Sequence, residues 1–254
     1  MFFDIDGTLY DHNKKLPESA KMALDQLKKN GVFVAIATGR APFMFKNLRE
    51  ELDIDSYVCF NGQYVVFENE VIYKNPLQTK ELERLTNLSF DNSHPIVYLN
   101  ENTMKSTVSD EHPMIAKSLV DSLKFPFPEV DEVFYKGREI YQALLFCEVG
   151  EEKEYHKNFP SFHFIRWHDY STDVIPAGGS KAEGIKIMIE RLGFQMKDVY
   201  AFGDGLNDIE MLKTVGTGIA MGNAKEEVKK AADVITTSVD EDGIWNGLKK
   251  LALI

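Results

Sequence analysis

Two carboxylates near the start of the chain, Asp4 and Asp6, have residue types and a spacing that could do chemistry. They follow Met1-Phe2-Phe3, a triplet typical of a short buried strand, and residues two apart on a strand point to the same side. Gly7 lets the backbone turn away without a side-chain clash. Two converging carboxylates repel each other, so they need a cation or a proton between them. This pattern suits one acid as nucleophile and metal ligand and the other as the group that handles protons.

Three further polar clusters follow predicted strands or begin predicted helices. They are Thr38-Gly39-Arg40, Lys181 behind Gly178-Gly179-Ser180, and Gly203–Asp208, which contains Asp204, Asn207 and Asp208. A hydroxyl and free backbone N–H groups at a helix start can hold an anion. A lysine adds a cation at the same edge of the sheet. Together the clusters predict one shared site for an anionic substrate.

The charges of these side chains predict a metal ion. Asp4, Asp204 and Asp208 would carry three negative charges, and Lys181 with one divalent cation would restore neutrality. Without those cations, an incoming phosphate would be repelled by about 4 kcal/mol for each unit-charge pair at close range and an effective dielectric of about 20. An all-oxygen ligand set favours a hard cation, so the sequence predicts Mg²⁺.

The elements that must position these residues alternate between strand and helix through residues 1–77 and 176–254. We expect strands at 1–3, 33–37, 57–60, 199–202, 218–221 and 234–236, helices at 17–30, 42–52, 181–192, 208–215 and 244–251, and a hairpin of 64–67 against 71–73. Such alternation predicts right-handed crossovers and an α/β fold with a doubly wound, Rossmann-like parallel sheet. Ligands bind beyond the carboxyl ends of such strands, where the polar clusters fall.

Between residues 78 and 175 the pattern changes. We expect helices at 79–88, 111–123 and 151–158 and strands at 96–99, 140–147, 162–167 and 172–175. Because the strands come largely in pairs, this segment is typical of an α+β domain. The sequence therefore predicts an α+β domain, 78–175, inserted into a core formed by 1–77 and 176–254.

Composition limits the classes of partner. The formal net charge of −11 disfavours nucleic acid and anionic membranes, which an acidic surface does not attract. No apolar run approaches membrane-spanning length, and we expect no signal peptide because Asp4 comes too soon for one. Cys59 and Cys147 stand in apolar stretches far apart, which favours buried thiols over a disulfide. We expect a cytoplasmic protein.

The four polar clusters resemble the four motifs of the haloacid dehalogenase (HAD) superfamily, and specifically those of its Cof-like hydrolases. The matches are Asp-x-Asp-Gly-Thr at Asp4–Thr8, a Thr after the next strand at Thr38, a Lys at a helix start at Lys181, and Gly-Asp-x-x-Asn-Asp at Gly203–Asp208. The Cof-like pattern extends to Asn61-Gly62, to residues 220–224 and to an inserted cap domain. The resemblance covers essentially the whole core, whereas across the cap it is architectural.

The resemblance implies an Mg²⁺-dependent phosphatase that acts on small phosphorylated metabolites such as sugar phosphates. By residue, it implies Asp4 as nucleophile forming an aspartyl-phosphate and Asp6 as acid and base. It implies Asp4, the carbonyl of Asp6, Asp204 and Asp208 at the metal, and Thr38, Gly39, Lys181 and Asn207 at the phosphate. Because Arg40 and Asn61-Gly62 stand at strand ends of the core, we expect them to face the cap and to assist in reading the leaving group. Asp208 would act through water or by orienting Lys181. We expect a monomer or homodimer.

Other classes of function remain open from the sequence. A phosphomutase of the same superfamily shares these motifs, and a catalytically silent metabolite-binding protein could keep the fold. A signalling receiver domain also phosphorylates an Asp, but it needs neither the long insertion nor an acid in the place of Asp6. Gly203–Asp208 begins like a dinucleotide fingerprint, yet it ends in Asp208 where Gly or Ala is needed.

Overall fold

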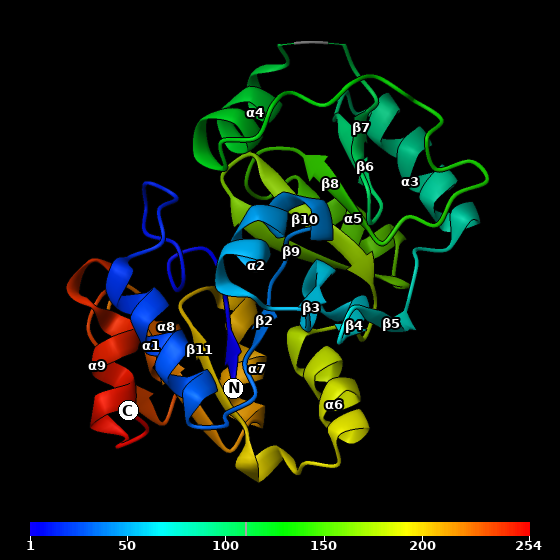
Figure 1. The fold of residues 1–254 in the computed structure, drawn as a ribbon. Coiled ribbons are helices and arrows are strands. Elements are labelled where there is room, and N and C mark those ends of the chain that lie inside the picture. The colour runs from blue at the N-terminus through cyan, green and yellow to red at the C-terminus, as the bar shows by residue number, and fades with distance from the viewer. Residues whose placement is uncertain (110) are drawn as a thin grey trace. The chain divides into compact units, whose positions relative to one another are not determined.

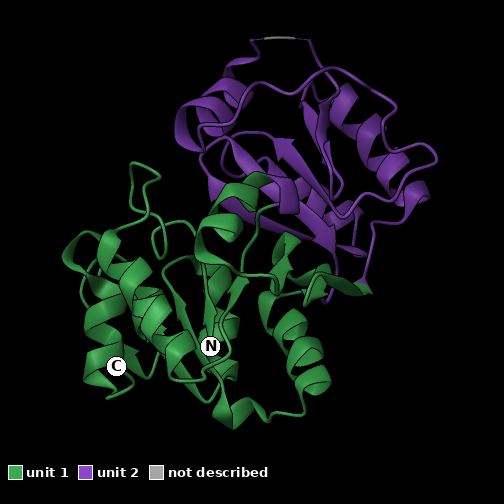
Figure 2. Ribbon diagram, in the orientation of Figure 1, with its two compact units in different colours: residues 1–40, 44–73, 180–254 green, residues 41–43, 74–179 purple. Residues whose placement is uncertain are grey.

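The computed structural model describes residues 1–109 and 111–254, which form two compact units (Figure 2). Unit 1 contains Met1–Arg40, Met44–Tyr73 and Ser180–Ile254, and unit 2 contains Ala41–Phe43 and Lys74–Gly179. The predicted insertion, 78–175, falls inside unit 2. The main segment of unit 2 extends beyond it on both sides, because this segment begins at Lys74, the end of the hairpin, and its last strand runs on to Pro176.

Unit 1 is built on an eight-stranded sheet (Figure 1). In spatial order its strands are β13 (Val234–Ile235), β12 (Thr217–Ala220), β11 (Tyr200–Gly203), β1 (Phe2–Phe3), β2 (Ala35–Ala37), β3 (Tyr57–Cys59), β4 (Tyr64–Phe67) and β5 (Glu70–Lys74). The strands from β13 to β3 pair in parallel, and β4 runs antiparallel to β3. Chain order runs outward from β1 in both directions, which confirms the predicted doubly wound sheet. The reversal point, where such sheets bind ligands, lies beside β1.

Helices cover both faces of this sheet. They are α1 (Glu18–Lys29), α2 (Lys46–Leu52), α6 (Lys181–Leu192), α7 (Ile209–Thr214), α8 (Glu226–Lys229) and α9 (Gly243–Lys250). Phe2 packs in a core with residues of α6 and α7. Phe3, on the opposite face, stacks on Phe202 at 5.1 Å between ring centroids, and Gly247 of α9 lies against that ring. Burying each phenylalanine stabilises the fold by about 1.5–3 kcal/mol, so this short central strand is firmly held.

Unit 2 is an α+β unit with a five-stranded sheet. In spatial order its strands are β7 (Met104–Ser106), β6 (Ile96–Leu99), β8 (Gln142–Phe146), β10 (Ser171–Pro176) and β9 (Phe162–His168), and its helices are α3 (Thr79–Asp91), α4 (Pro113–Ile115), a π-helix at Ala116–Ser122 and α5 (Glu152–Asn158). Neighbouring strands pair antiparallel. One sheet face forms an apolar core with α3 and α5, in which Leu82, Leu85 and Tyr155 are fully or almost fully buried.

Several elements differ from the sequence predictions. The predicted helix at 42–52 is a 3-10 turn, Pro42–Phe45, followed by α2, because Phe45 leaves helical geometry at φ −132°. The predicted helix at 111–123 contains only three α-helical residues before the π-helix. The sequence prediction missed β7 and α8, which have three and four residues and are too short for a periodic pattern.

The two thiols are as predicted: Cys59 and Cys147 are both free and buried. Across residues 1–109 and 111–254, no helix has the length and apolar character needed to cross a bilayer.

Candidate active site

Three carboxylates gather at the carboxyl ends of adjacent strands in unit 1. Asp4 directly follows β1, Asp204 directly follows β11, and Asp208 closes the 3-10 turn Leu206–Asp208. Each offers an oxygen within 4.8 Å of the others. The backbone N–H of Asp4 donates to the carbonyl of Phe202 at 3.0 Å, which fixes the two strand ends together. The parallel pairing of β1 with β11 thus unites residues some 200 positions apart.

Lys181 is the cation inside this cluster. It begins α6, whose Ser180 cap accepts a hydrogen bond from the N–H of Glu183. Its Nζ donates to Asp4 Oδ1 and to Asp208 Oδ1, each at 2.6 Å, and its side chain has no exposed surface. Burial alone would lower the pKa of Lys181, but Asp208 and Asp4 together raise it above its ordinary value. Lys181 therefore stays charged and joins two carboxylates.

Asp208 has both carboxylate oxygens engaged within the protein. Oδ1 accepts from Lys181, and Oδ2 accepts from the backbone N–H groups of Asp204 and Gly205 at 3.0 and 2.9 Å. Of the two roles expected for Asp208, metal ligation through water or orientation of Lys181, this geometry matches the second.

We expect Lys181→Met to destabilise the metal-free protein strongly, because removing one partner from a buried ion pair costs about 3–5 kcal/mol. Urea unfolding in EDTA measures the loss. Lys186→Met is the matched control: Lys186 stands on the same helix, and its 42% exposed side chain pairs with Glu183. This surface pair should contribute about 1 kcal/mol or less. Equal losses in the two variants would contradict the structural role of Lys181.

Asp204 is held by two residues that the sequence prediction gave no role. Thr8 Oγ1 donates to Asp204 Oδ1 at 3.0 Å, and Asn223 Nδ2 donates to the carbonyl of Gly7 at 2.9 Å and to Asp204 Oδ2 at 3.3 Å. Gly7 has φ +83°, and a Cβ there would lie 2.2 Å from Asp204 Oδ2. Thr8 and Asn223 stand inside the first motif and the 220–224 pattern, which was the only signal for them.

Lys181 does not compensate the full negative charge of the three acids. Burial raises the pKa of Asp4 to about 7, with Asp208 adding to the rise and Lys181 opposing it. Burial, reinforced by the charge of Asp4, raises the pKa of Asp204 to about 8. A bound proton or cation would stabilise these carboxylates, and their oxygens are the ligand atoms that a hard divalent ion prefers.

These shifts predict how stability depends on pH. Without metal, the folded state binds more protons at Asp4 and Asp204 than the unfolded state from pH 3.8 to about 8, so the free energy of unfolding should fall as pH rises through this range. Mg²⁺ should flatten that fall by stabilising the charged carboxylates. Thermal unfolding in EDTA and in Mg²⁺ tests this. Parallel pH profiles in the two conditions would show that no cation binds these acids.

Asp6 has different surroundings from Asp4. Arg40 donates from Nη2 to Asp6 Oδ1 at 2.6 Å and from Nε to Oδ2 at 2.7 Å, and Lys14 Nζ donates to Oδ1 at 2.6 Å. Burial would raise the pKa of Asp6, but Arg40 and then Lys14 lower it to about 2. In this arrangement Asp6 is a carboxylate without a proton. The sequence prediction missed Lys14 altogether.

The predicted phosphate-binding segment Thr38-Gly39-Arg40 follows β2. Thr38 is buried, and its Oγ1 accepts from the backbone N–H of Arg40 at 3.1 Å. The Arg40 guanidinium contacts Asp6, donates to the carbonyl of Met44 at 3.3 Å and lies 5.7 Å from the ring centre of Tyr10. Arg40 was expected near the leaving group, and in this structure its guanidinium holds Asp6, the predicted acid and base.

Asn61 and Gly62 pack against two segments of the site, Asn207 and the start of α6. Asn207 Nδ2 donates to Asn61 Oδ1 at 3.0 Å, and Asn61 is 1% exposed. Gly62 has φ +96°, and a Cβ there would lie 2.0 Å from the carbonyl oxygen of Ser180. The pair was expected beside the leaving group. In this structure Asn61 contacts Asn207 and Gly62 packs against Ser180 at the start of α6, where only glycine permits the close approach.

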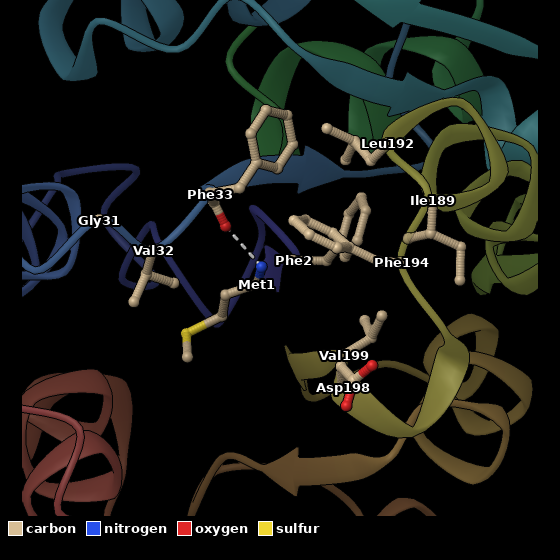
Figure 3. Close-up of a pocket in the computed structure, with 10 residues that line it drawn as sticks. All are labelled: Met1, Phe2, Gly31, Val32, Phe33, Ile189, Leu192, Phe194, Asp198 and Val199. Atoms are coloured by element: carbon tan, nitrogen blue, oxygen red, sulfur yellow. Dashed lines mark hydrogen bonds between the residues drawn. The ribbon is translucent and has the colours of Figure 1, made fainter.

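A cavity of about 200 Å³ lies at the amino ends of the strands, opposite to the cluster of acids (Figure 3). Its lining is Met1, Phe2, Gly31, Val32, Phe33, Ile189, Leu192, Phe194, Asp198 and Val199. The lining is almost entirely apolar, and none of the predicted site residues contributes to it. This cavity is therefore separate from the cluster of acids.

The fold and this cluster define a class of enzyme, and comparison with known proteins agrees. The chain belongs to the haloacid dehalogenase-like hydrolases, whose family model matches residues 1–248. It is therefore a hydrolase of that superfamily, and several of its relatives are named as phosphatases.

Individual relatives cover nearly the whole chain. YkrA of Bacillus subtilis, whose name gives phosphatase activity as a provisional assignment, is 54% identical over 254 residues, 100% of this chain and 98% of that protein. The 5-amino-6-(5-phospho-D-ribitylamino)uracil phosphatase YcsE of Bacillus subtilis is 31% identical over 98% of this chain and 94% of its own. The solved structure of the subclass IIB sugar phosphatase BT4131 is 33% identical with a TM-score of 0.90, over 100% and 98% of the two chains.

Proposed function

We propose that this protein is a phosphatase that hydrolyses phosphate monoesters of small metabolites, such as sugar phosphates, with Mg²⁺ and through an aspartyl-phosphate on Asp4. One observation carries the proposal. Asp4, Asp204 and Asp208 meet within 4.8 Å at the strand ends, and Lys181 pairs with two of them, Asp4 and Asp208. A carboxylate nucleophile, a hard-cation site and a fixed ammonium are the parts that phosphoryl transfer needs.

The residues present fit a magnesium ion. Asp4, Asp204 and the main-chain carbonyl of Asp6 would hold it, while Asp208 positions Lys181. When bound, Mg²⁺ would neutralise carboxylate and phosphate charge and so let the anionic substrate approach Asp4. The raised pKa values of Asp4 and Asp204 support this assignment, because they arise where negative charge exceeds its compensation.

The remaining chemistry belongs to side chains of this protein. Asp4 attacks phosphorus, so a bond from its carboxylate oxygen to phosphorus forms as the bond to the leaving oxygen breaks. Asp6, after it leaves Arg40 and Lys14 and takes up a proton from solvent, gives that proton to the leaving oxygen. It afterwards takes a proton from the water that cleaves the aspartyl-phosphate. Lys181, Thr38, Asn207 and the N–H of Gly39 would bind the phosphoryl oxygens. The catalytic advantage lies mainly in positioning and electrostatics.

We assign the choice of alcohol to the inserted domain, residues 78–175, which would act as a cap. Contacts to phosphate and metal are the same for every monoester, so the residues that make those contacts cannot by themselves distinguish one leaving group from another. Exchanging 78–175 for the corresponding segment of a relative with another preference should transfer that preference. A folded chimera that keeps its original ranking of substrates would exclude this role.

The net charge of the protein and its two cysteines indicate its class of ligand and its compartment. With a net charge of −11, we infer no nucleic-acid or membrane partner, and a small phosphorylated metabolite as the ligand. Two free, buried cysteines suit the reducing cytoplasm. We propose a monomer or homodimer, which sedimentation would determine.

Hydrolysis of p-nitrophenyl phosphate tests the proposed activity. We expect turnover with Mg²⁺, loss of turnover in EDTA and recovery when Mg²⁺ is returned in excess. Turnover that EDTA leaves unchanged would contradict the metal assignment. Absence of turnover from the folded, Mg²⁺-supplied protein on this ester and on a panel of phosphorylated metabolites would favour a silent binding protein.

A further inference from the structure

Lys14 and Arg40 form a cationic seat in unit 1 that Asp6 now fills. We define the seat by Lys14 Nζ and by Nε and Nη2 of Arg40. These three nitrogens donate to the Asp6 carboxylate at 2.6, 2.7 and 2.6 Å. The Lys14 side chain is 20% exposed and that of Arg40 is 7% exposed. The seat is therefore a partly dehydrated site with two positive charges and one carboxylate.

The loop that carries Lys14 is built to place it there. Asp11 Oδ1 accepts from the N–H groups of Asn13 and Lys15, both at 2.8 Å, and the N–H of Lys14 donates to the carbonyl of Asp11 at 3.0 Å. This turn puts Lys14 in the left-handed region at φ 59°. The hydrogen bonds of the turn hold the Lys14 backbone in this conformation.

The proposed reaction must empty the seat for part of each cycle. Both carboxylate oxygens of Asp6 are engaged by Arg40 and Lys14, so Asp6 must give up these contacts to reach the leaving oxygen. When Asp6 turns to that oxygen, Lys14 loses its contact. Within residues 1–109 and 111–254, Lys14 Nζ donates its hydrogen bond to Asp6. A partly buried ammonium without its carboxylate is destabilised unless another anion replaces it.

We propose that Lys14 is a specificity residue that binds a carboxylate on the alcohol portion of the substrate, in the place Asp6 vacates. The preferred substrates are then phosphate monoesters of hydroxy acids rather than of neutral polyols. Arg40 shares the seat, and its planar guanidinium suits a two-oxygen contact with a carboxylate. The inference rests on the proposed phosphatase function and adds the class of leaving group.

A matched pair of substrates tests the seat. 3-Phosphoglycerate and glycerol 3-phosphate differ mainly in a carboxylate against a hydroxymethyl group. In the Lys14→Met variant, the ratio of kcat/KM for 3-phosphoglycerate to that for glycerol 3-phosphate should fall about 10- to 100-fold, the value of one charge-assisted hydrogen bond. Lys14→Arg should restore most of it. Lys15→Met should leave the ratio unchanged, because Lys15 is its exposed neighbour and carries the same charge.

Two outcomes of the kinetic experiment would overturn the inference. They are a ratio that Lys14→Met does not change and a ratio that Lys14→Met and Lys15→Met lower equally. Binding separates this failure from a failure of the proposed function. Calorimetric titration of the Asp4→Asn protein, which should not turn over, should show tighter binding of 3-phosphoglycerate and loss of that preference with Lys14→Met added. If the protein prefers 3-phosphoglycerate in binding but the wild type does not hydrolyse either compound, the proposed phosphatase function is wrong and the role of Lys14 stands. If 3-phosphoglycerate and glycerol 3-phosphate bind equally well, the role of Lys14 is wrong.

Discussion

Asp4→Asn should remove turnover while leaving the fold intact. An amide is a poor nucleophile and a weaker metal ligand, so we expect a loss of about 10⁴-fold or more in kcat. The same substitution removes a negative charge from a cluster whose burial already raises the pKa of Asp4 to about 7. The metal-free variant should therefore unfold at a higher temperature than the parent protein.

Asp25→Asn is the matched control for that experiment. It makes the same chemical change at an exposed position of α1 and should alter neither turnover nor stability appreciably. Steady-state kinetics with p-nitrophenyl phosphate and thermal unfolding in EDTA give the two readings. Near-normal turnover by a folded Asp4→Asn protein would exclude Asp4 as the nucleophile.

Asp6→Asn should distinguish between kinds of leaving group. Alkyl alcohols leave with a proton, so their phosphates should lose about 10²- to 10⁴-fold in kcat, the usual contribution of a general acid. An aryl phosphate such as p-nitrophenyl phosphate needs no proton on its leaving oxygen and should lose far less in the first step.

The comparison requires both esters on both proteins, with the rate of alcohol release measured in each case. Equal losses on alkyl and aryl phosphates would mean that Asp6 serves mainly to hold Arg40 and Lys14, the contacts it makes in the structure. The alkyl-to-aryl ratio therefore decides between a proton donor and a structural ion pair.

The motif positions show what the sequence could predict about the site. Asp4, Thr38 and Asp204 directly follow β1, β2 and β11. These positions could be predicted, because an apolar strand followed by polar residues is visible as a pattern of residue types. Parallel pairing then brings those ends together, so a cluster of acids could be inferred without coordinates. Lys181 begins α6 at the residue where the helix was predicted to start.

Contacts that depend on turns and on exact packing could not be predicted this way. Lys14 reaches Asp6 only because a side-chain turn at Asp11 fixes its backbone, and no periodic pattern reports such a turn. The close packing of Gly62 against Ser180 and the hydrogen bond between Asn61 and Asn207 could not be predicted from the pattern either. The π-helix at Ala116–Ser122 has the apolar spacing of an ordinary helix, so its geometry was also hidden.

The direct test of the mechanism is to identify the covalent intermediate. The protein is mixed with p-nitrophenyl phosphate and Mg²⁺, quenched in acid within the first turnover and digested with trypsin, and the peptide that ends at Lys14 is analysed by mass spectrometry. We predict that a fraction of this peptide carries one additional phosphoryl group at Asp4, that hydroxylamine removes it, and that omitting Mg²⁺ prevents it. Rapid turnover with no phosphorylated peptide at any quench time, or with the group on another residue, would contradict an aspartyl-phosphate on Asp4.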